Sequence, residues 1–236
     1  MPDLVVVVPS RGRPASVRGL AEVFRQTCTA GTLICLAIDA DDPCREQYHA
    51  AAGEFPGVFS GVVEQPAGGT MVTALNLAAG TVAPTHFAVG FMGDDHCPRT
   101  HGWDSAYLVA LRDLGTGIVY GDDLIQRERL PTQCAMTAGI VLALGWMAPP
   151  TLRHLAVDDW WLALGRAAGC IRYLPEVVVE HRHPVAGTAV VDEGYLRVND
   201  PQMYRHDLAE FRRLAAGELL VAAAKVNRLR GVPAGG

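Results

Sequence analysis

The sequence lacks C-x-x-C spacing and the cysteine framework of a small disulfide-bonded fold. Its six cysteines are scattered along the chain: Cys28, Cys35, Cys44, Cys97, Cys134 and Cys170. Cysteines in this arrangement are typical of reduced thiols in a cytoplasmic protein, and we expect several of them to be ordinary core residues.

Long apolar runs and targeting signals are also lacking. No apolar run approaches the length of a membrane span, and Met1 to Leu4 include neither a basic region nor a cleavage site. We therefore expect a cytoplasmic protein without membrane insertion. The net charge of −5 and the pI near 5.9 provide no general attraction to nucleic acid, so any bound phosphate must be held by local groups.

The composition is that of a globular protein, since 50% of the 236 residues are hydrophobic and 19% are charged. Apolar runs at 4–8, 33–38 and 87–92 predict strands buried on both faces, with helical patterns between them. We predict an α/β domain over residues 1–184. Residues 185–236 are expected to form an amphipathic helical extension that packs on the domain or on a second copy of the chain, with Gly231 to Gly236 disordered.

The third of these apolar runs stops abruptly at Gly93-Asp94-Asp95-His96. Gly93 lets the backbone turn, so the following side chains converge at the carboxyl end of a strand, the edge where ligands bind in open α/β sheets. Two adjacent carboxylates repel each other unless a cation lies beside them, and a divalent ion holding phosphate oxygens would satisfy both. The alternative is a solvated turn, because Gly-Asp-Asp is ordinary turn chemistry.

Polar residues follow other predicted strands as well. Ser10-Arg11-Gly12-Arg13 is suited to a phosphate or a base, or is a solvated loop. Among Asp39, Asp41 and Asp42, we expect one acid to cap a helix and another to bind a ribose or base. Gly68-Gly69 allows close backbone approach to a ligand but lacks the Gly-Lys-Ser/Thr ending of a Walker loop. Asp122-Asp123 is expected to be surface charge paired with the loop after it.

Acids and histidines recur late in the chain. Asp158-Asp159 lies near the start of a helix, where the helix dipole alone would explain acids. Trp160 and Trp161 cannot share one helix face, so we expect one in the core and the other lining a cleft. His181 and His183 alternate at the end of a strand and therefore point the same way, as two metal ligands or a ligand and its support would.

The order of these motifs resembles the nucleotide-sugar-binding half of family 2 type glycosyltransferases with the GT-A fold. The motifs are Val-Pro-Ser-Arg, Ile-Asp-Ala-Asp-Asp, Gly-Gly before Ala74-Leu75-Asn76, Phe-Met-Gly-Asp-Asp-His, Asp158-Asp159 in place of Glu-Asp, and the late His-Arg-His-Pro. The resemblance covers about residues 4 to 184. It implies a Rossmann-like, mixed and mostly parallel sheet, a nucleotide-diphosphate sugar donor, and Mn²⁺ or Mg²⁺ as cofactor.

The resemblance also implies roles for single residues. The nucleotide would lie along Pro9, Ser10, Arg11, Arg13, Asp39, Asp41, Gly69 and Asp94. Asp95 would be the direct metal ligand within an Asp-x-Asp or Asp-x-His motif, with His96 a possible second ligand, and His181 or else His183 would complete the metal shell. Gly93 departs from the family pattern, because it occupies the place of the first aspartate in one register.

An inverting transferase needs a base for the acceptor hydroxyl, and Asp159 is the first candidate with Asp158 second. Trp103, Trp160 or Trp161 would stack on an acceptor sugar, or belong to the core. The stereochemistry and the acceptor stay open, the latter a small metabolite, glycan, protein or modified DNA. The alternatives are a degenerate scaffold that binds a sugar nucleotide or a partner, a nucleotidyltransferase, and a metal hydrolase.

Overall fold

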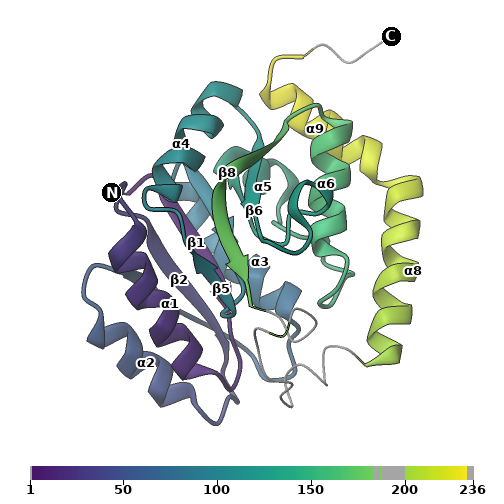
Figure 1. Ribbon diagram of the computed structural model, residues 1–236. Helices are drawn as coiled ribbons and strands as arrows, with labels where there is room; N and C mark the ends of the chain where they lie inside the picture. Colours follow the sequence, from purple (N-terminus) through teal and green to yellow (C-terminus); the bar gives the residue numbers. More distant parts are fainter. Residues whose placement is uncertain (1, 183–186, 188–199, 233–236) are drawn as a thin grey trace.

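The computed structural model describes residues 2–182, 187 and 200–232. Within these residues, eight strands form one sheet in the order β3-β2-β1-β4-β7-β6-β8-β5 (Figure 1). The strands are β1 (Leu4–Pro9), β2 (Leu33–Asp39), β3 (Phe59–Gln65), β4 (Ala88–Phe91), β5 (His96–Pro98), β6 (Ile118–Asp122), β7 (Cys134–Thr137) and β8 (Ile171–His181). Strand β7 is antiparallel to β4 and β6, and β5 is antiparallel to β8. The other pairs are parallel, which confirms the predicted mixed, mostly parallel sheet.

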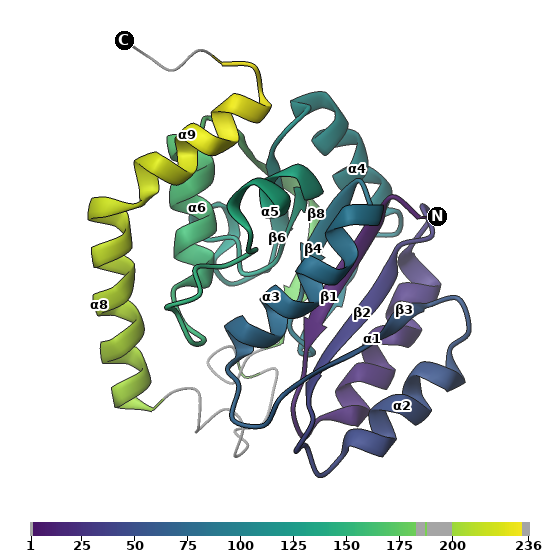
Figure 2. The same cartoon turned by 180° about the vertical axis from the view of Figure 1, so that it is seen from behind.

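Helices cover both faces of the sheet (Figures 1 and 2). One face carries α1 (Pro14–Thr27), α2 (Arg45–Glu54) and α4 (Trp103–Leu114). The other face carries α3 (Met71–Val82), α5 (Ala138–Leu144) and α6 (Val157–Ala167), and short 3₁₀ turns follow at Ala83–Thr85 and Arg127–Arg129. Helix α1 begins at Pro14, because the fixed φ of proline suits the first helical turn.

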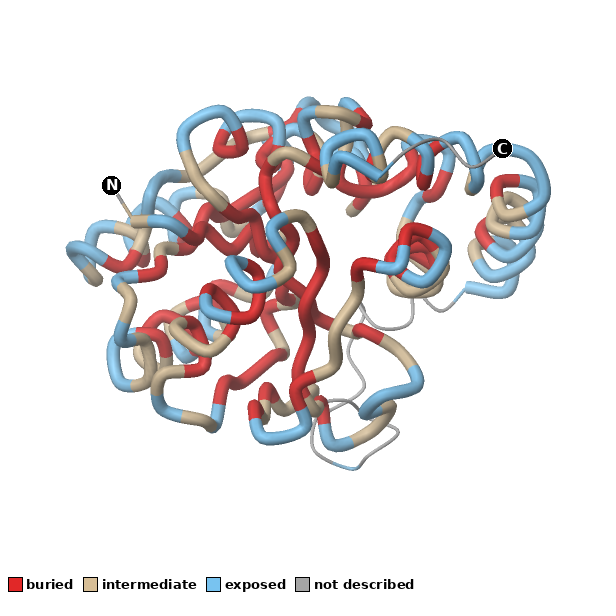
Figure 3. Tube along the Cα trace, turned by 90° about the horizontal axis from the view of Figure 1, so that it is seen from above, coloured by how far each residue is buried: buried red, intermediate tan, exposed pale blue. Residues whose placement is uncertain are grey.

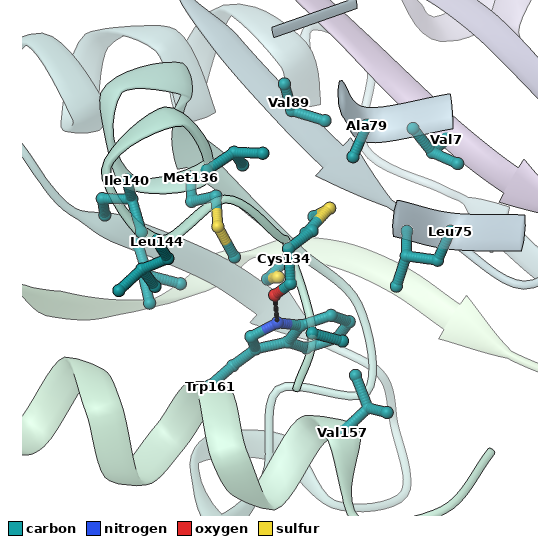
Figure 4. Packing of buried hydrophobic residues seen from close by; sticks show 14 of the residues in the cluster. Val7, Leu75, Ala79, Val89, Cys134, Met136, Ile140, Leu144, Val157 and Trp161 are labelled. Carbon is teal, nitrogen blue, oxygen red and sulfur yellow. Dashed lines mark hydrogen bonds between the residues drawn. The ribbon is translucent and has the colours of Figure 1, made fainter. Parts of the chain in front are cut away.

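The central strands are buried on both sides, as the tube coloured by burial shows (Figure 3). Along β1, Val5 and Val7 belong to the core beneath α3, α5 and α6, whereas Leu4, Val6 and Val8 belong to the core beneath α1, α2 and α4. Figure 4 shows the first core, in which Val7, Leu75 and Met136 pack with Trp161. This two-sided packing explains the continuous apolar runs and gives the strand ends a rigid base.

The C-terminal segment contains two helices and not one continuous one. Helix α8 (Pro201–Gly217) and helix α9 (Leu219–Leu229) meet at Glu218, and both lie along the outer side of α6 in Figure 1. Ala222, Ala223 and Val226 of α9 complete the core beneath α5 and α6. His183 and the last predicted disordered residues, Pro233 to Gly236, lie outside the described residues.

Two further expectations from composition can be compared with the structure. All six cysteines are free thiols. Among the described helices, none is long and apolar enough to cross a membrane.

Candidate functional site

A cleft of about 1120 Å³ runs along the carboxyl ends of the parallel strands. One part is lined by the loops after β1, β2 and β4 and by the start of α3. The opposite part is lined by residues 153–158, by the loop around Ile125, and by Met203 and Tyr204 of α8. Apart from Asp42, the polar positions selected at the ends of β1, β2 and β4 therefore come together at one cavity.

A cluster of possible metal ligands lies at the middle of this cleft. Among the described residues, Asp95, His96 and His181 bring one ligand atom each within 4.8 Å of one another. Asp95 Oδ2 is 3.5 Å from His181 Nε2, and Asp95 Oδ1 is 3.3 Å from His96 Nδ1. A carboxylate oxygen and an imidazole nitrogen at this separation fit one divalent ion such as Mn²⁺.

Among these three candidate ligands, His96 has the least accessible ring nitrogens. Its Nδ1 accepts a hydrogen bond from the Gly93 N–H at 2.9 Å, and its Nε2 is buried without a protein partner. Burial, followed by the nearby His181 charge, lowers the pKa of His96 and keeps the ring neutral. His96 therefore fixes the turn after β4, whereas Asp95 and His181 face the cleft with ligand atoms that a metal can reach.

The two adjacent acids of this turn have different environments. Burial would raise the pKa of Asp95, but the nearby His181 and His96 outweigh burial and hold that pKa below its usual range. Asp94 accepts a hydrogen bond from Ser10 Oγ at 2.5 Å and lies 3.3 Å from Arg13. Burial and the charge of Asp95 raise the pKa of Asp94 to about 6. Asp94 thus ties the loop after β1 to the turn after β4, and Asp95 is the acid suited to a cation.

Steric crowding explains why position 93 holds a glycine, where the family that the sequence resembles has an aspartate in one register. A Cβ atom at Gly93 would lie 2.5 Å from Asp95 Oδ1 and 3.1 Å from His96 Nδ1. Any side chain at this position would push the Asp95 carboxylate out of its place. Gly93 therefore leaves the Asp95 carboxylate in its place, which gives the glycine a role other than that of a lost acid.

Charged and polar groups at the other end of the cleft form a connected network. Arg11 Nη1 donates to Asp39 at 2.5 Å and to Asp41 at 2.7 Å. Gln65, at the end of β3, donates to Asp39 and to Thr70 O and accepts from Thr73 Oγ1 at 2.6 Å. Arg11 is therefore neutralised by two acids and not a free phosphate ligand. Sequence reasoning missed Gln65, although a glutamine that ends a strand at the ligand-binding edge was a usable signal.

Neighbouring residues have structural tasks in this network. Asp42 accepts from the N–H groups of Gly12 and Cys44, at 2.8 and 2.7 Å, but it does not cap α2, because the N-cap position is Cys44 and has no side-chain cap hydrogen bond. Gly69 packs against Gln65, and a Cβ atom there would lie 2.3 Å from the amide of that side chain. Glycine is thus needed for the close approach of the α3 loop to Gln65.

The two candidate bases differ in what they face. Asp158 lines the cleft, whereas Asp159, the first choice from the sequence, does not. Burial and the neighbouring Asp159 charge raise the pKa of Asp158 to about 6. A carboxylate with this pKa near the Asp95–His181 pair is suited to accept a proton at neutral pH.

No protein-family model matches the chain, and no curated protein matches it. Solved structures do match. A mannosyltransferase from Pyrobaculum calidifontis in complex with GDP-Man and Mn²⁺ aligns with 99% of this chain and 76% of its own, with 16% identity and a TM-score of 0.68. S. aureus TarS 1-349 with UDP-GlcNAc aligns with 98% of this chain and 83% of its own, with 12% identity and a TM-score of 0.57.

A third similar structure is glucosyl-3-phosphoglycerate synthase from Mycobacterium tuberculosis, with Mn²⁺, UDP and glucosyl-3-phosphoglycerate. It aligns with 100% of this chain and 82% of its own, with 14% identity and a TM-score of 0.54. The chain has the GT-A fold. The alignments run through the C-terminal helices, so α8 and α9 are also accommodated by GT-A structures.

In this GT-A structure Trp103 and Trp160 belong to the core, which is one of the two alternatives stated for the tryptophans. Trp103 is fully buried between Phe24 and Tyr107, and Trp160 is buried against Trp146, so neither can stack on an acceptor. Both faces of α6 are covered, by the sheet and by α9, which is why adjacent tryptophans are both buried. Trp161 borders the cleft, but it is only 1% exposed and its indole N–H donates to Met147 O at 2.8 Å (Figure 4).

The expectation of surface charge was wrong for Asp123. This residue is 1% exposed, and its Oδ1 accepts from the N–H groups of Ile125, Gln126 and Arg127 at 2.6 to 2.9 Å. Its Oδ2 accepts from Thr132 Oγ1 at 2.8 Å. Asp123 therefore organises the loop that forms one wall of the GT-A cleft.

Proposed function

We propose that this protein is a metal-dependent glycosyltransferase that moves a sugar from a nucleotide-diphosphate sugar to an acceptor hydroxyl. The observation that carries the proposal is the Asp95–His181 pair at the centre of the strand-end cleft, with ligand atoms 3.5 Å apart. Mn²⁺ or Mg²⁺ in the similar structures, together with UDP or GDP-Man, supports the same choice of cofactor and donor class. The free cysteines support the cytoplasm as its place of action.

We assign the donor to the β1, β2 and α3 side of the cleft. Asp39, held by Arg11 and Gln65, is suited to accept hydrogen bonds from the base or ribose. Asp95 and His181 would hold the cation, which when bound neutralises charge that develops on the departing nucleoside diphosphate. The loop after β1 is held against the turn after β4 by the contacts of Ser10 and Arg13 with Asp94. The same connected group of residues would therefore bind both the nucleotide and the metal.

We assign the acceptor to the opposite wall. If the transfer inverts the sugar, the acceptor hydroxyl must lose a proton, and Asp158 is the carboxylate that faces the cleft. Retaining chemistry would not require this base. Asp159 serves as its matched control, because the two acids are neighbours on the same helix turn.

A degenerate GT-A scaffold is the second candidate. Its main support was the missing acid at Gly93, and this support is removed by the close contact that a Cβ atom would make with Asp95. The polar groups at both ends of the cleft also remain connected by hydrogen bonds.

Thermal stabilisation by UDP, GDP and their sugars, with Mn²⁺ and with chelator, tests the proposal. A ligand that binds the native state raises the melting temperature, so a shift that chelator abolishes is expected for one nucleotide class. Asp95→Ala should lose that shift, and unchanged Mn²⁺-dependent affinity in this variant would contradict the metal assignment. Asp158→Asn should bind donor and lose transfer in an inverting enzyme, whereas Asp159→Asn should keep most of both.

A further inference from the structure

A buried carboxylate on the C-terminal helix α8 holds one wall of the cleft. Asp207 is 0% exposed. Its Oδ1 accepts from the Arg153 N–H at 3.1 Å, and its Oδ2 accepts from the N–H groups of His154 and Leu155 at 2.8 and 2.7 Å. His206 Nδ1 lies 2.7 Å from Asp207 Oδ1. Three consecutive backbone N–H groups therefore donate to one side chain that is distant in the sequence.

The segment held in this way leads directly to the candidate base. Residues 153–158 all line the cleft, and helix α6 begins at Val157. Ala156, at the helix start, has a φ of 59°, a left-handed conformation that a residue with a Cβ adopts only when its surroundings impose it. On its other side the segment is fixed to α3, because the Val72 N–H donates to Arg153 O at 3.2 Å. Asp207 and α3 together fix the backbone that carries Asp158.

We propose that Asp207 is a positioning residue, which presents Asp158 and the adjoining wall to the acceptor. The role of Asp158 as a base rests on the proposed function. The hydrogen bonds between Asp207 and residues 153–155 do not depend on it. A carboxylate without exposure is costly unless all its oxygens are used, and here both oxygens accept from the same loop. Asparagine cannot replace it, since one of the two sets of N–H groups would then face an amide NH₂.

The arrangement separates donor binding from transfer. The proposed donor ligands, Asp39, Asp95 and His181, lie at or just after the ends of β2, β4 and β8, whereas the N–H groups that Asp207 holds belong to residues 153–155, before α6. Loosening the Asp207 contacts should therefore leave the nucleotide side intact and disturb only the Asp158 side. A purely structural role for Asp207 predicts a loss of stability alone.

The first test uses the full chain and needs no substrate. The carboxyl ¹³C resonance of Asp158, identified by its absence in Asp158→Asn, should titrate near pH 6 in the wild type, because the pKa of Asp158 is raised to about 6. In Asp207→Asn it should titrate at lower pH, and amides 153–158 should exchange at least about 10-fold faster with solvent. Leu214→Ala is the control: it removes buried packing from α8 without touching the loop, so it should lower the melting temperature only.

The second test measures function in the same variants. Binding of UDP or GDP with Mn²⁺ should stay within about threefold of the wild type in Asp207→Asn, while release of sugar from UDP-GlcNAc or GDP-mannose falls at least about 10-fold in kcat. If the wild type binds neither nucleotide, the proposed function fails and the NMR and exchange results still decide the role of Asp207.

Equal titration of Asp158 and equal amide exchange in a folded Asp207→Asn would overturn the proposal. If that variant does not fold, Asp207→Glu gives the same information, since it keeps the charge but moves the oxygens by one methylene. The expected changes then have the same direction and a smaller size.

Discussion

His96 and His181 are direct partners in the antiparallel pairing of β5 with β8, and their imidazole rings stack with centroids 4.4 Å apart. The pairing brings the turn after β4 against the end of β8, although 85 residues separate the two histidines in the sequence. Because Gly93 N–H engages His96, the two rings have different tasks: one fixes the turn and the other reaches Asp95.

His181→Ala should lower the Mn²⁺-dependent affinity for the nucleoside diphosphate. The variant loses the imidazole that faces Asp95, and loss of a direct ligand should cost more than the roughly 10-fold typical of an outer partner. Isothermal titration with and without Mn²⁺ measures this affinity. His49→Ala, which removes an exposed histidine paired with Glu64, is the control and should bind like the wild type. Equal Mn²⁺ dependence in both variants would refute the ligand assignment.

Gly93→Ala should weaken metal binding without a comparable loss of stability. The added Cβ meets the end of the Asp95 side chain, which can rotate away, so the fold tolerates the methyl group but the metal ligand moves. We expect a change in melting temperature of only a few degrees and an affinity for Mn²⁺ reduced at least about 10-fold. Gly80→Ala, with no atom near its Cβ, should keep full metal affinity. Wild-type Mn²⁺ affinity in Gly93→Ala would disprove this account of the glycine.

Asp39→Asn should reduce nucleotide affinity with and without metal. The substitution removes the charge that Arg11 neutralises and disturbs the hydrogen bond from Gln65, at a cost of about 10-fold or more for a charged hydrogen bond. Asp3→Asn removes an exposed acid paired with Arg112 and should have no effect. Affinity equal to that of the wild type would move the nucleotide away from this end of the cleft.

Asp158→Asn should change how stability depends on pH. The folded-state pKa of Asp158 is about 6 and the ordinary value is about 3.9, so between these pH values the folded protein binds more protons than the unfolded chain. The contribution of Asp158 to the free energy of unfolding of the wild type therefore falls as pH rises from about 4 to 6, and stays lowered at pH 7.

The Asp158→Asn variant cannot ionise at this position, so its free energy of unfolding does not include this fall. Its stability relative to the wild type should increase by roughly 1 to 3 kcal/mol between pH 4 and pH 7, measured by chemical denaturation at each pH. Asp113→Asn, at an exposed acid, serves as the control. Parallel curves of unfolding free energy against pH for Asp158→Asn and the wild type would show that burial does not raise the pKa of the Asp158 carboxyl.

The parts of the fold that were predicted correctly rest on local patterns. Strand β1 is apolar throughout because both its faces are buried, and such a run is visible in the sequence. Asparagine is unfavourable inside a helix, and Asn76 is held in α3 by partners 71 and 72 residues away, which no local pattern predicts. Its amide donates to Ala148 O at 2.8 Å and its oxygen accepts from Met147 and Ala148.

The parts that were missed depend on contacts distant in the sequence. Asp123 and Asp207 look like surface acids in the sequence, yet each is buried and holds three backbone N–H groups. The mostly apolar residues 131–147 cannot be assigned to a strand or a helix by periodicity alone. They contain β7 followed directly by α5, and no single period can describe such a segment.

The order of the elements along the chain has a consequence for folding during synthesis. Helix α6 leaves the ribosome before α9, although Ala222, Ala223 and Val226 of α9 cover the core to which Trp160 and Trp161 belong. Until α9 emerges, this tryptophan-bearing surface is open to chaperones and to aggregation. Asp207 also follows the loop that it holds, so a nascent chain ending before α8 lacks the anchor of this wall of the cleft.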